Sequence, residues 1–250
     1  KQQEKKRLSK RTRVSLFLLL VAIPLTIAAG FWLTDQSALA DWIDRVFGPR
    51  KYYLISLVIV LYALLPFFMA FEGRKPEVRE LVVLATMIAL ATAGRAAFFM
   101  TPSFKPIIAI VIISAIAFGA EAGFLVGSMT MLVSNFLFGQ GPWTPWQMFA
   151  MGFIGFLSGI LYRLRILPTK RLQLSVYGFL VTFMIYGGIM NPAALFMSVY
   201  QFSWSGLLAI YISGVPVDLV HASSTFLFLW IGAKPLLEKL QRIKVKYGLL

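Results

Sequence analysis

The chain contains no cysteine and only one histidine, His221, among its 250 residues. It therefore has no disulfide framework, no thiolate nucleophile, and neither a cysteine nor a multi-histidine metal centre. Acidic residues are also scarce, with 10 Asp and Glu against 24 Lys and Arg. The sequence has no G-x-x-x-x-G-K-[ST] phosphate loop, no H-E-x-x-H motif and no G-x-S-x-G motif, so it offers no recognisable ATPase, metalloprotease or hydrolase centre of its own.

Apolar residues, in contrast, are abundant: 59% of the chain is hydrophobic and only 14% is charged. A water-soluble core of this size cannot bury so much apolar surface, so the composition predicts an all-α, polytopic membrane helix bundle. The net charge of +14 lies mostly in short loops and tails. We therefore expect the cations to face anionic lipid headgroups of the bilayer, and we expect no nucleic acid partner.

Eight apolar runs are predicted to be membrane spans. One of them, 107–118, is short and could form one long, bent helix with 122–138, but the charge pattern favours two spans. Two of them, 14–33 and 53–71, come first, and the first is too long for a signal-peptide core. The other six are residues 81–99, 107–118, 122–138, 147–162, 172–190 and 215–231. A further apolar stretch, 193–213, is interrupted by polar residues and is predicted to be an external re-entrant or surface-lying segment.

The positive charges predict the orientation. Of the 24 Lys and Arg, 19 lie at the two ends of the chain (1–13 and 234–247) and in the loops at 72–80 and 163–171. Because cytoplasmic loops are enriched in Lys and Arg, both termini are predicted to be cytoplasmic, with loops 100–106, 139–146 and 191–214 outside. The predicted organisation is a basic cytoplasmic tail (1–13), two extra N-terminal transmembrane helices (14–77), a six-helix core (78–235) and a second basic cytoplasmic tail (236–250).

Small residues recur at every fourth position on three predicted helices. The first core helix carries Ala85, Ala89, Ala93 and Ala97, and glycines repeat at 119, 123 and 127 and again at 155 and 159. Small residues at this spacing let a second helix approach closely. We interpret the glycines as internal packing, whereas the alanine stripe fits either internal packing or the docking of a partner.

Ionisable residues also occur within the predicted spans. Asp218 and His221 lie three residues apart on one face of the last span, and Arg95 lies in the outer half of the first core span. Such residues usually face a cavity or a partner. Asp218 and His221 fit either a substrate cavity or a structural pair. A small intramembrane enzyme would depend on these two residues, with Ser213, Ser223 or Ser224 as a nucleophile that nothing else supports.

An uncharged aromatic segment, FGQGPWTPWQ at 138–147, separates two of the long apolar runs. Its glycines free the backbone and its prolines prevent a continuous helix. Trp143 and Trp146 are of the type that settles at a membrane–water boundary. The segment fits either an interfacial turn or a mobile rim over a ligand.

From about residue 78 onward the sequence resembles the substrate-binding S components of energy-coupling factor (ECF) vitamin transporters. The resemblance is carried by the alanine stripe, by TPSFKP at 101–106, by the glycine repeat from 119 to 127, by SNFLFGQGPWTPWQ at 134–147 and by PVDLVHA at 216–222. The block at 138–146 is most similar to the cobalamin-specific branch. The two N-terminal spans depart from the family's six-helix pattern.

This resemblance implies a non-catalytic subunit of the bacterial plasma membrane that captures a micronutrient outside the cell. The best match is cobalamin (vitamin B12) or another corrinoid, with riboflavin or a queuine-type base as further ligands, and neither a covalent cofactor nor a metal is expected. The implied partners are an ECF transmembrane coupling subunit, docked on the alanine stripe, and two ATP-binding subunits. The remaining alternative is a self-sufficient secondary transporter or channel.

The candidate substrate-binding residues combine polar side chains with aromatic rings near the predicted external side. They are Arg95, Phe104, Asn135, Gln140, Trp143, Trp146, Gln147, Asp218 and His221.

Overall fold

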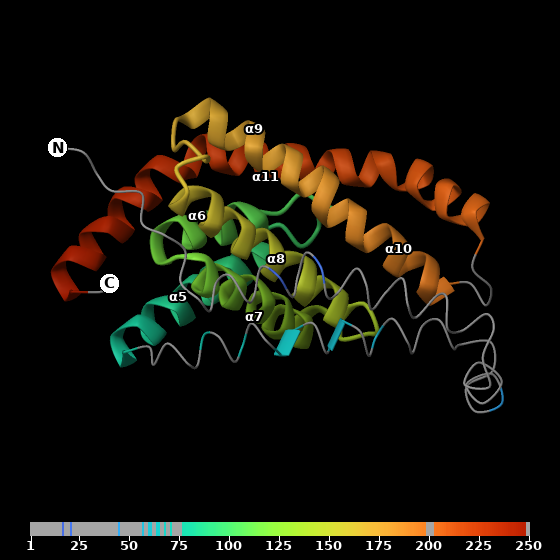
Figure 1. Cartoon of the computed structure of the whole chain (residues 1–250), viewed down its shortest axis with the longest axis horizontal. Coiled ribbons are helices and arrows are strands. Elements are labelled where there is room, and N and C mark those ends of the chain that lie inside the picture. Colours follow the sequence, from blue (N-terminus) through green and yellow to red (C-terminus); the bar gives the residue numbers. More distant parts are fainter. Residues whose placement is uncertain are drawn as a thin grey trace.

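The computed structural model of the chain describes residues 77–198 and 203–248, together with ten single residues between 17 and 71. The two described ranges form helices and no strand (Figure 1): α5 (Val78–Ala97), α6 (Ile107–Phe118), α7 (Ala120–Phe138), α8 (Thr144–Arg163), α9 (Arg171–Val181), the π-helical turn η3 (Thr182–Tyr186), α10 (Gly187–Ser198) and α11 (Trp204–Tyr247). Five helical units, with α9 to α10 as one, are long and apolar enough to cross a membrane, and α6 is a shorter apolar helix.

This is the all-α membrane bundle that the composition predicts. Each of the six predicted core spans corresponds to one of these helical units, and the bounds of α6 coincide with the predicted run. The predicted tail at 1–13 lies outside the described residues. Of the predicted span at 14–33, only two single positions are described.

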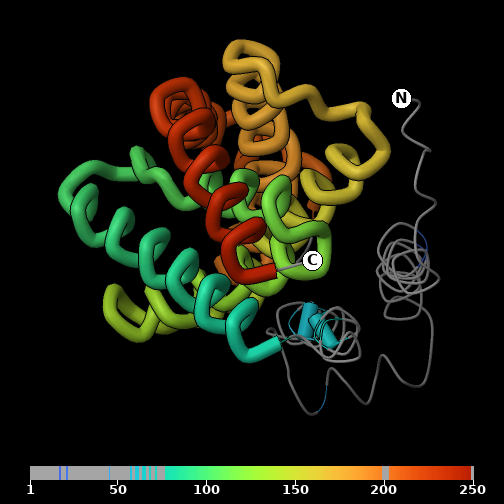
Figure 2. Tube along the Cα trace, turned by 90° about the vertical axis from the view of Figure 1, so that its left-hand side faces the viewer, coloured from blue at the N-terminus to red at the C-terminus, as the bar shows by residue number. Residues whose placement is uncertain are grey.

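The helices pack around α6. All twelve residues of α6 are buried, as expected for a helix whose sequence is apolar on every side. Viewed along the bundle, α5 and α9 lie on opposite sides (Figure 2). The start of α5 and the end of α11 lie at one end of the molecule, and the end of α10 and the start of α11 lie at the other (Figure 1). We call this second end, which the charge pattern predicts to be outside, the α10–α11 end.

Glycines let α7 and α8 pack with their backbones nearly in contact. A Cβ atom added at Gly127 would overlap the backbone of Met151, and one added at Gly155 would overlap the backbone of Gly123. The glycine repeats are therefore internal packing, as predicted. Gly119 has a different role, because its φ of 97° makes the turn between α6 and α7.

The packing of α7 against α8 leads to a first prediction. Gly127→Ala is expected to lower the thermal unfolding midpoint in detergent, because the new methyl group meets backbone atoms that no rotamer change can move away. Gly232→Ala is the matched control: it also lies within a helix, but its added Cβ meets nothing within 4 Å. An equal or higher midpoint for Gly127→Ala would contradict the close packing.

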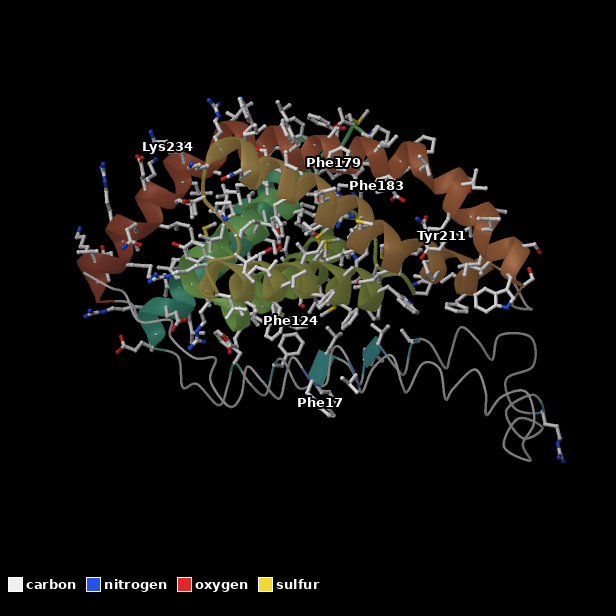
Figure 3. All side chains as sticks on the ribbon, turned by 45° about the horizontal axis from the view of Figure 1, so that its top comes forward. Phe17, Phe124, Phe179, Phe183, Tyr211 and Lys234 are labelled. Carbon is white, nitrogen blue, oxygen red and sulfur yellow. The ribbon has the colours of Figure 1, made fainter. Side chains whose placement is uncertain are left out.

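The prediction of a separate external segment at 193–213 is wrong. Residues up to Ser198 continue α10, and α11 already begins at Trp204. Helix α10 continues through Pro192, which cannot donate to the carbonyl of Gly188. The hydroxyl of Tyr211 donates to that carbonyl at 2.9 Å instead. Figure 3 shows Tyr211 where α11 runs beside α10.

The second predicted N-terminal span contributes side chains to the core. Its buried or half-buried described residues recur every three or four positions, as on one face of a helix: Leu57, Val60, Leu64, Phe68 and Phe71. The ring of Phe68 meets that of Phe124 on α7 edge-on, with centroids 6.0 Å apart. Phe68, a described residue of the second predicted span, therefore packs against α7.

Helix α11 extends past residue 236, where the C-terminal tail is predicted to start, and ends at Tyr247. Leu240 is buried. The ammonium group of Lys244 donates to the carbonyl of Ala117 at 2.6 Å and lies over the ring of Phe118. A cation at this position satisfies a free carbonyl of the last turn of α6.

Candidate functional site

Asn135, near the end of α7, is fully buried and joins three helices. Its Oδ1 accepts a hydrogen bond of 2.6 Å from Nη1 of Arg95 on α5. Its Nδ2 donates to Oγ1 of Thr144 and to Oε1 of Gln147 on α8, both at 2.9 Å. Because buried amides are costly to leave unpaired, this network fixes the position of four polar side chains.

Arg95 has neutral partners among the described residues. The same Nη1 that contacts Asn135 also donates to Oγ of Ser134 at 2.7 Å. Its guanidinium lies 5.3 Å from the centroid of the Phe138 ring, a favourable position for a cation. Within the described chain, Arg95 therefore binds α7.

The π-helical turn η3 brings Tyr186 to the same network. Tyr186 lies near Gln147, and the rings of Tyr186 and His221 meet edge-on with centroids 4.7 Å apart. Single π-helical turns within helices often occur at functional sites. Sequence reasoning missed Tyr186, although Tyr186-Gly187-Gly188 interrupts an otherwise apolar run and could have indicated it.

Asp218 and His221 have different partners in the structure. Oδ2 of Asp218 accepts a hydrogen bond of 2.8 Å from Nδ2 of Asn191 on α10, and Gly187 leaves room for the carboxylate. His221 is buried against Tyr186. The two residues thus fix α11 to α10 and to η3, respectively.

The segment between α7 and α8 is a hydrogen-bonded turn. The hydroxyl of Thr144 donates to Oε1 of Gln140 at 2.8 Å, and Nε2 of Gln140 donates to the carbonyl of Leu132 at 3.3 Å. Its two tryptophans differ: Trp143 is 39% exposed and Trp146 only 8%. Trp143 therefore lies at the surface of this turn, whereas Trp146 belongs to the interior.

The buried position of Trp146 differs from the predicted boundary position. Its ring stacks on that of Phe196, with centroids 6.3 Å apart and planes at 26°. Val60 and Ala193 complete this small buried cluster. Its Nε1 has no hydrogen-bond partner among the described residues.

The loop between α5 and α6 lies against α11. The ring of Phe104 is half-buried between those of Phe98 and Phe228, at centroid distances of 5.9 and 5.5 Å. Next to it, the carbonyl of Lys105 accepts a hydrogen bond of 2.9 Å from Oγ of Ser224. The backbone carrying Lys105 is thus held at the same end of the bundle as Arg95.

Helices α5, α7 and α8 therefore meet in one polar network, Arg95–Asn135–Gln147. Tyr186 of η3 and His221 of α11 pack against each other beside it. Within the two described ranges no group of three or more His, Asp or Glu side chains is arranged to hold a metal ion. These features define a class of protein: a multi-pass membrane bundle with a polar network between helices at one end.

A family model described as ECF-type riboflavin transporter, S component, matches residues 75–242. The chain belongs to this family. No curated protein sequence and no solved structure gives a significant match to the chain. The matched range nearly coincides with the predicted core at 78–235, so the two predicted N-terminal spans precede the family domain.

Membership in this family makes the chain the substrate-capture subunit of an ECF transporter. S components are multi-pass membrane proteins that act as transport subunits and not as enzymes. ATP hydrolysis belongs to their partner subunits. The six helical units that the structure describes within the matched range agree with the six-helix core expected from the sequence.

Proposed function

We propose that the chain captures a flavin, with riboflavin as the reference ligand, near the end of α7 and the start of α8, and delivers it through an ATP-driven ECF complex. The observation that carries this proposal is that the family match spans every element of the polar network. The resemblance of the 138–146 block favoured cobalamin, but the description of the matched family names riboflavin as the transported ligand. Flavin is therefore the first ligand to test and cobalamin the second.

The polar network suits a flat, amphipathic ligand. Gln147 offers an amide group that the buried Asn135 already holds in place by a hydrogen bond, which lowers the entropic cost of binding. The rings of Tyr186, His221 and Phe138 supply apolar faces near these amides. In this proposal Arg95, Asn135 and Gln147 orient the ligand, and the other candidate residues shape its surroundings.

Partner docking is proposed for the alanine stripe on α5. Ala85, Ala89, Ala93 and Ala97 are all exposed in the described structure, so the stripe is not used for packing within this part of the chain. A smooth helix face of this kind allows a second membrane helix to approach closely. The exposed stripe supports docking of the ECF transmembrane coupling subunit, which acts with two ATP-binding subunits.

The proposal is tested by titrating the purified, ligand-free protein in detergent with riboflavin and, separately, with cobalamin. Binding of riboflavin quenches its fluorescence, and we expect a dissociation constant in the range of about 1 nM to 1 µM, or roughly −12 to −8 kcal/mol. Saturable binding of cobalamin without binding of riboflavin would reassign the ligand. Binding of neither would reject the proposed function.

A second prediction concerns the α7–α8 turn. Replacing Gln140 and Trp143 together with alanine is expected to weaken ligand binding by about tenfold, because the turn loses two hydrogen bonds and its exposed ring. The measurement is the same titration, with expression level and elution profile as controls for folding. Unchanged affinity would make the segment a simple interfacial turn.

A further inference from the structure

The first turn of α8 carries two residues that pair with Asn135, Thr144 and Gln147. Within the described part of the chain, no side chain caps this helix start: the N-cap residue is Trp143, and Pro145 follows within the first turn. The backbone N–H groups at a helix start have no partner inside the helix, and a side-chain cap normally stabilises them. The position of this turn therefore depends on what its side chains contact.

Side chains on two opposite faces hold this turn. On one face, Thr144 and Gln147 each accept a hydrogen bond of 2.9 Å from Nδ2 of Asn135 on α7. Trp146 projects from the other side than Thr144, since residues two positions apart in a helix lie about 200° apart around its axis. The ring of Trp146 stacks on that of Phe196 on α10. The first turn of α8 is thus fixed between α7 and α10.

Only apolar contacts hold the ring of Trp146. Its Nε1 has no hydrogen-bond partner among the described residues, so packing fixes the ring. The cluster that buries it contains Ala193 and Phe196 from α10 and Val60 from the second predicted N-terminal span. Because dispersion contacts act only at close range, a ring that loses one wall of such a cluster is no longer fixed.

The span that supplies Val60 precedes the family domain, which starts at residue 75. Val60 and Leu64 are each 4% exposed, whereas Leu61 and Leu65 are 47% and 56% exposed, so the two pairs lie on different faces. Leu64 belongs to the main hydrophobic core instead of the Trp146 cluster. Of these two buried residues, only Val60 therefore packs in the cluster of Trp146, the residue next to Gln147.

We infer that the second predicted N-terminal span is part of the ligand site and that Val60 is a positioning residue. Val60 holds Trp146 against α10, and Trp146 in turn fixes the first turn of α8, which carries Gln147. This inference rests on the proposed function, because the proposed ligand lies at this turn. It gives a segment outside the family domain a role in binding in addition to its role in packing.

The first test titrates riboflavin into the purified full chain and follows flavin fluorescence. Val60→Ala is expected to weaken binding by about fivefold or more, because Gln147 is no longer held in one orientation before the ligand arrives. The same variant should lower the thermal unfolding midpoint only modestly, since it removes two methyl groups.

Leu64→Ala is the matched control, because it also removes a buried side chain of the same span. It should lower the unfolding midpoint at least as much as Val60→Ala and leave the affinity for riboflavin within about twofold of the wild type. An equal loss of affinity in both variants would assign the effect to general stability and overturn the inference.

A spectroscopic measurement on ligand-free protein tests whether Val60 acts on Trp146. The emission of Trp146 is obtained as the difference between a protein with this residue and the same protein carrying Trp146→Phe. In Val60→Ala this emission should move to longer wavelength, because the loosened ring meets water, and in Leu64→Ala it should stay as in the wild type. Unchanged emission in Val60→Ala would overturn the positioning role.

The outcomes separate this inference from the proposed function. If the wild type binds neither riboflavin nor cobalamin, the proposed function fails and the inference fails with it. If the wild type binds riboflavin and Val60→Ala binds it equally well, only the inference fails. If the wild type binds cobalamin instead, the same comparison of Val60→Ala with Leu64→Ala is made with cobalamin, and equal affinities would again overturn the inference.

Discussion

Replacing both Ala89 and Ala93 with leucine is expected to reduce flavin uptake at least about tenfold while ligand affinity stays within about twofold of the wild type. Both alanines are exposed on α5, so larger side chains there have space within this chain but would separate α5 from a docked helix. Uptake is measured in cells that also produce the ECF partner subunits, and affinity by titration of the purified protein.

The matched control for this experiment is Ala209→Leu, an exposed alanine on α11 instead of α5. It should leave uptake unchanged. If the double variant loses ligand binding together with uptake, the stripe is part of the packed bundle and not a docking surface. If both activities persist, the partner uses another face.

Replacing Asn135 with leucine is expected to weaken ligand binding by about 30-fold or more and to lower the unfolding midpoint. The amide is fully buried and pairs with Arg95, Thr144 and Gln147. Leaving each buried polar partner unpaired costs about 1 to 3 kcal/mol, and about 2 kcal/mol corresponds to 30-fold in affinity. The measurements are flavin titration and thermal unfolding.

Ser128→Ala separates stability from binding. Ser128 is also buried on α7, and its hydroxyl donates to the carbonyl of Met148 at 2.9 Å, away from the polar network. Its loss should lower the unfolding midpoint without changing the affinity for ligand. An Asn135→Leu protein that binds flavin as the wild type does would show that the network is structural only.

Much of the fold follows from apolar length and small residues. The apolar run at 107–118 has charged or turn-forming neighbours at both ends, and it forms a helix with those bounds. The glycines of α7 and α8 were assigned to internal packing because their spacing repeats every four residues, and the close backbone contacts of Gly127 and Gly155 confirm this.

The sequence could not predict how α10 and α11 begin and end. Asn191-Pro192 favours a break, and only the hydroxyl of Tyr211, contributed by another helix, satisfies the carbonyl that Pro192 leaves free. Trp146 was expected at the membrane boundary by its residue type, but Phe196 and Val60 bury it. Such contacts between distant segments have no local signal.

The candidate site was predicted in part. Arg95, Asn135 and Gln147 were chosen for their depth in the predicted spans, and the structure joins them directly. Tyr186 and Asn191 were missed, because their position depends on the π-helical turn η3 and on the α10–α11 contact. Whether each of these residues touches the ligand stays a prediction.

The central claim is that this chain captures a flavin and depends on separate ATP-hydrolysing partners to transport it. The most direct test measures uptake of radiolabelled riboflavin into proteoliposomes containing this chain, with and without the ECF coupling subunit and two ATP-binding subunits. We expect saturable binding by the chain alone, and accumulation inside only when the partners and internal ATP are both present. Accumulation by the chain alone would contradict the account and identify a self-sufficient transporter.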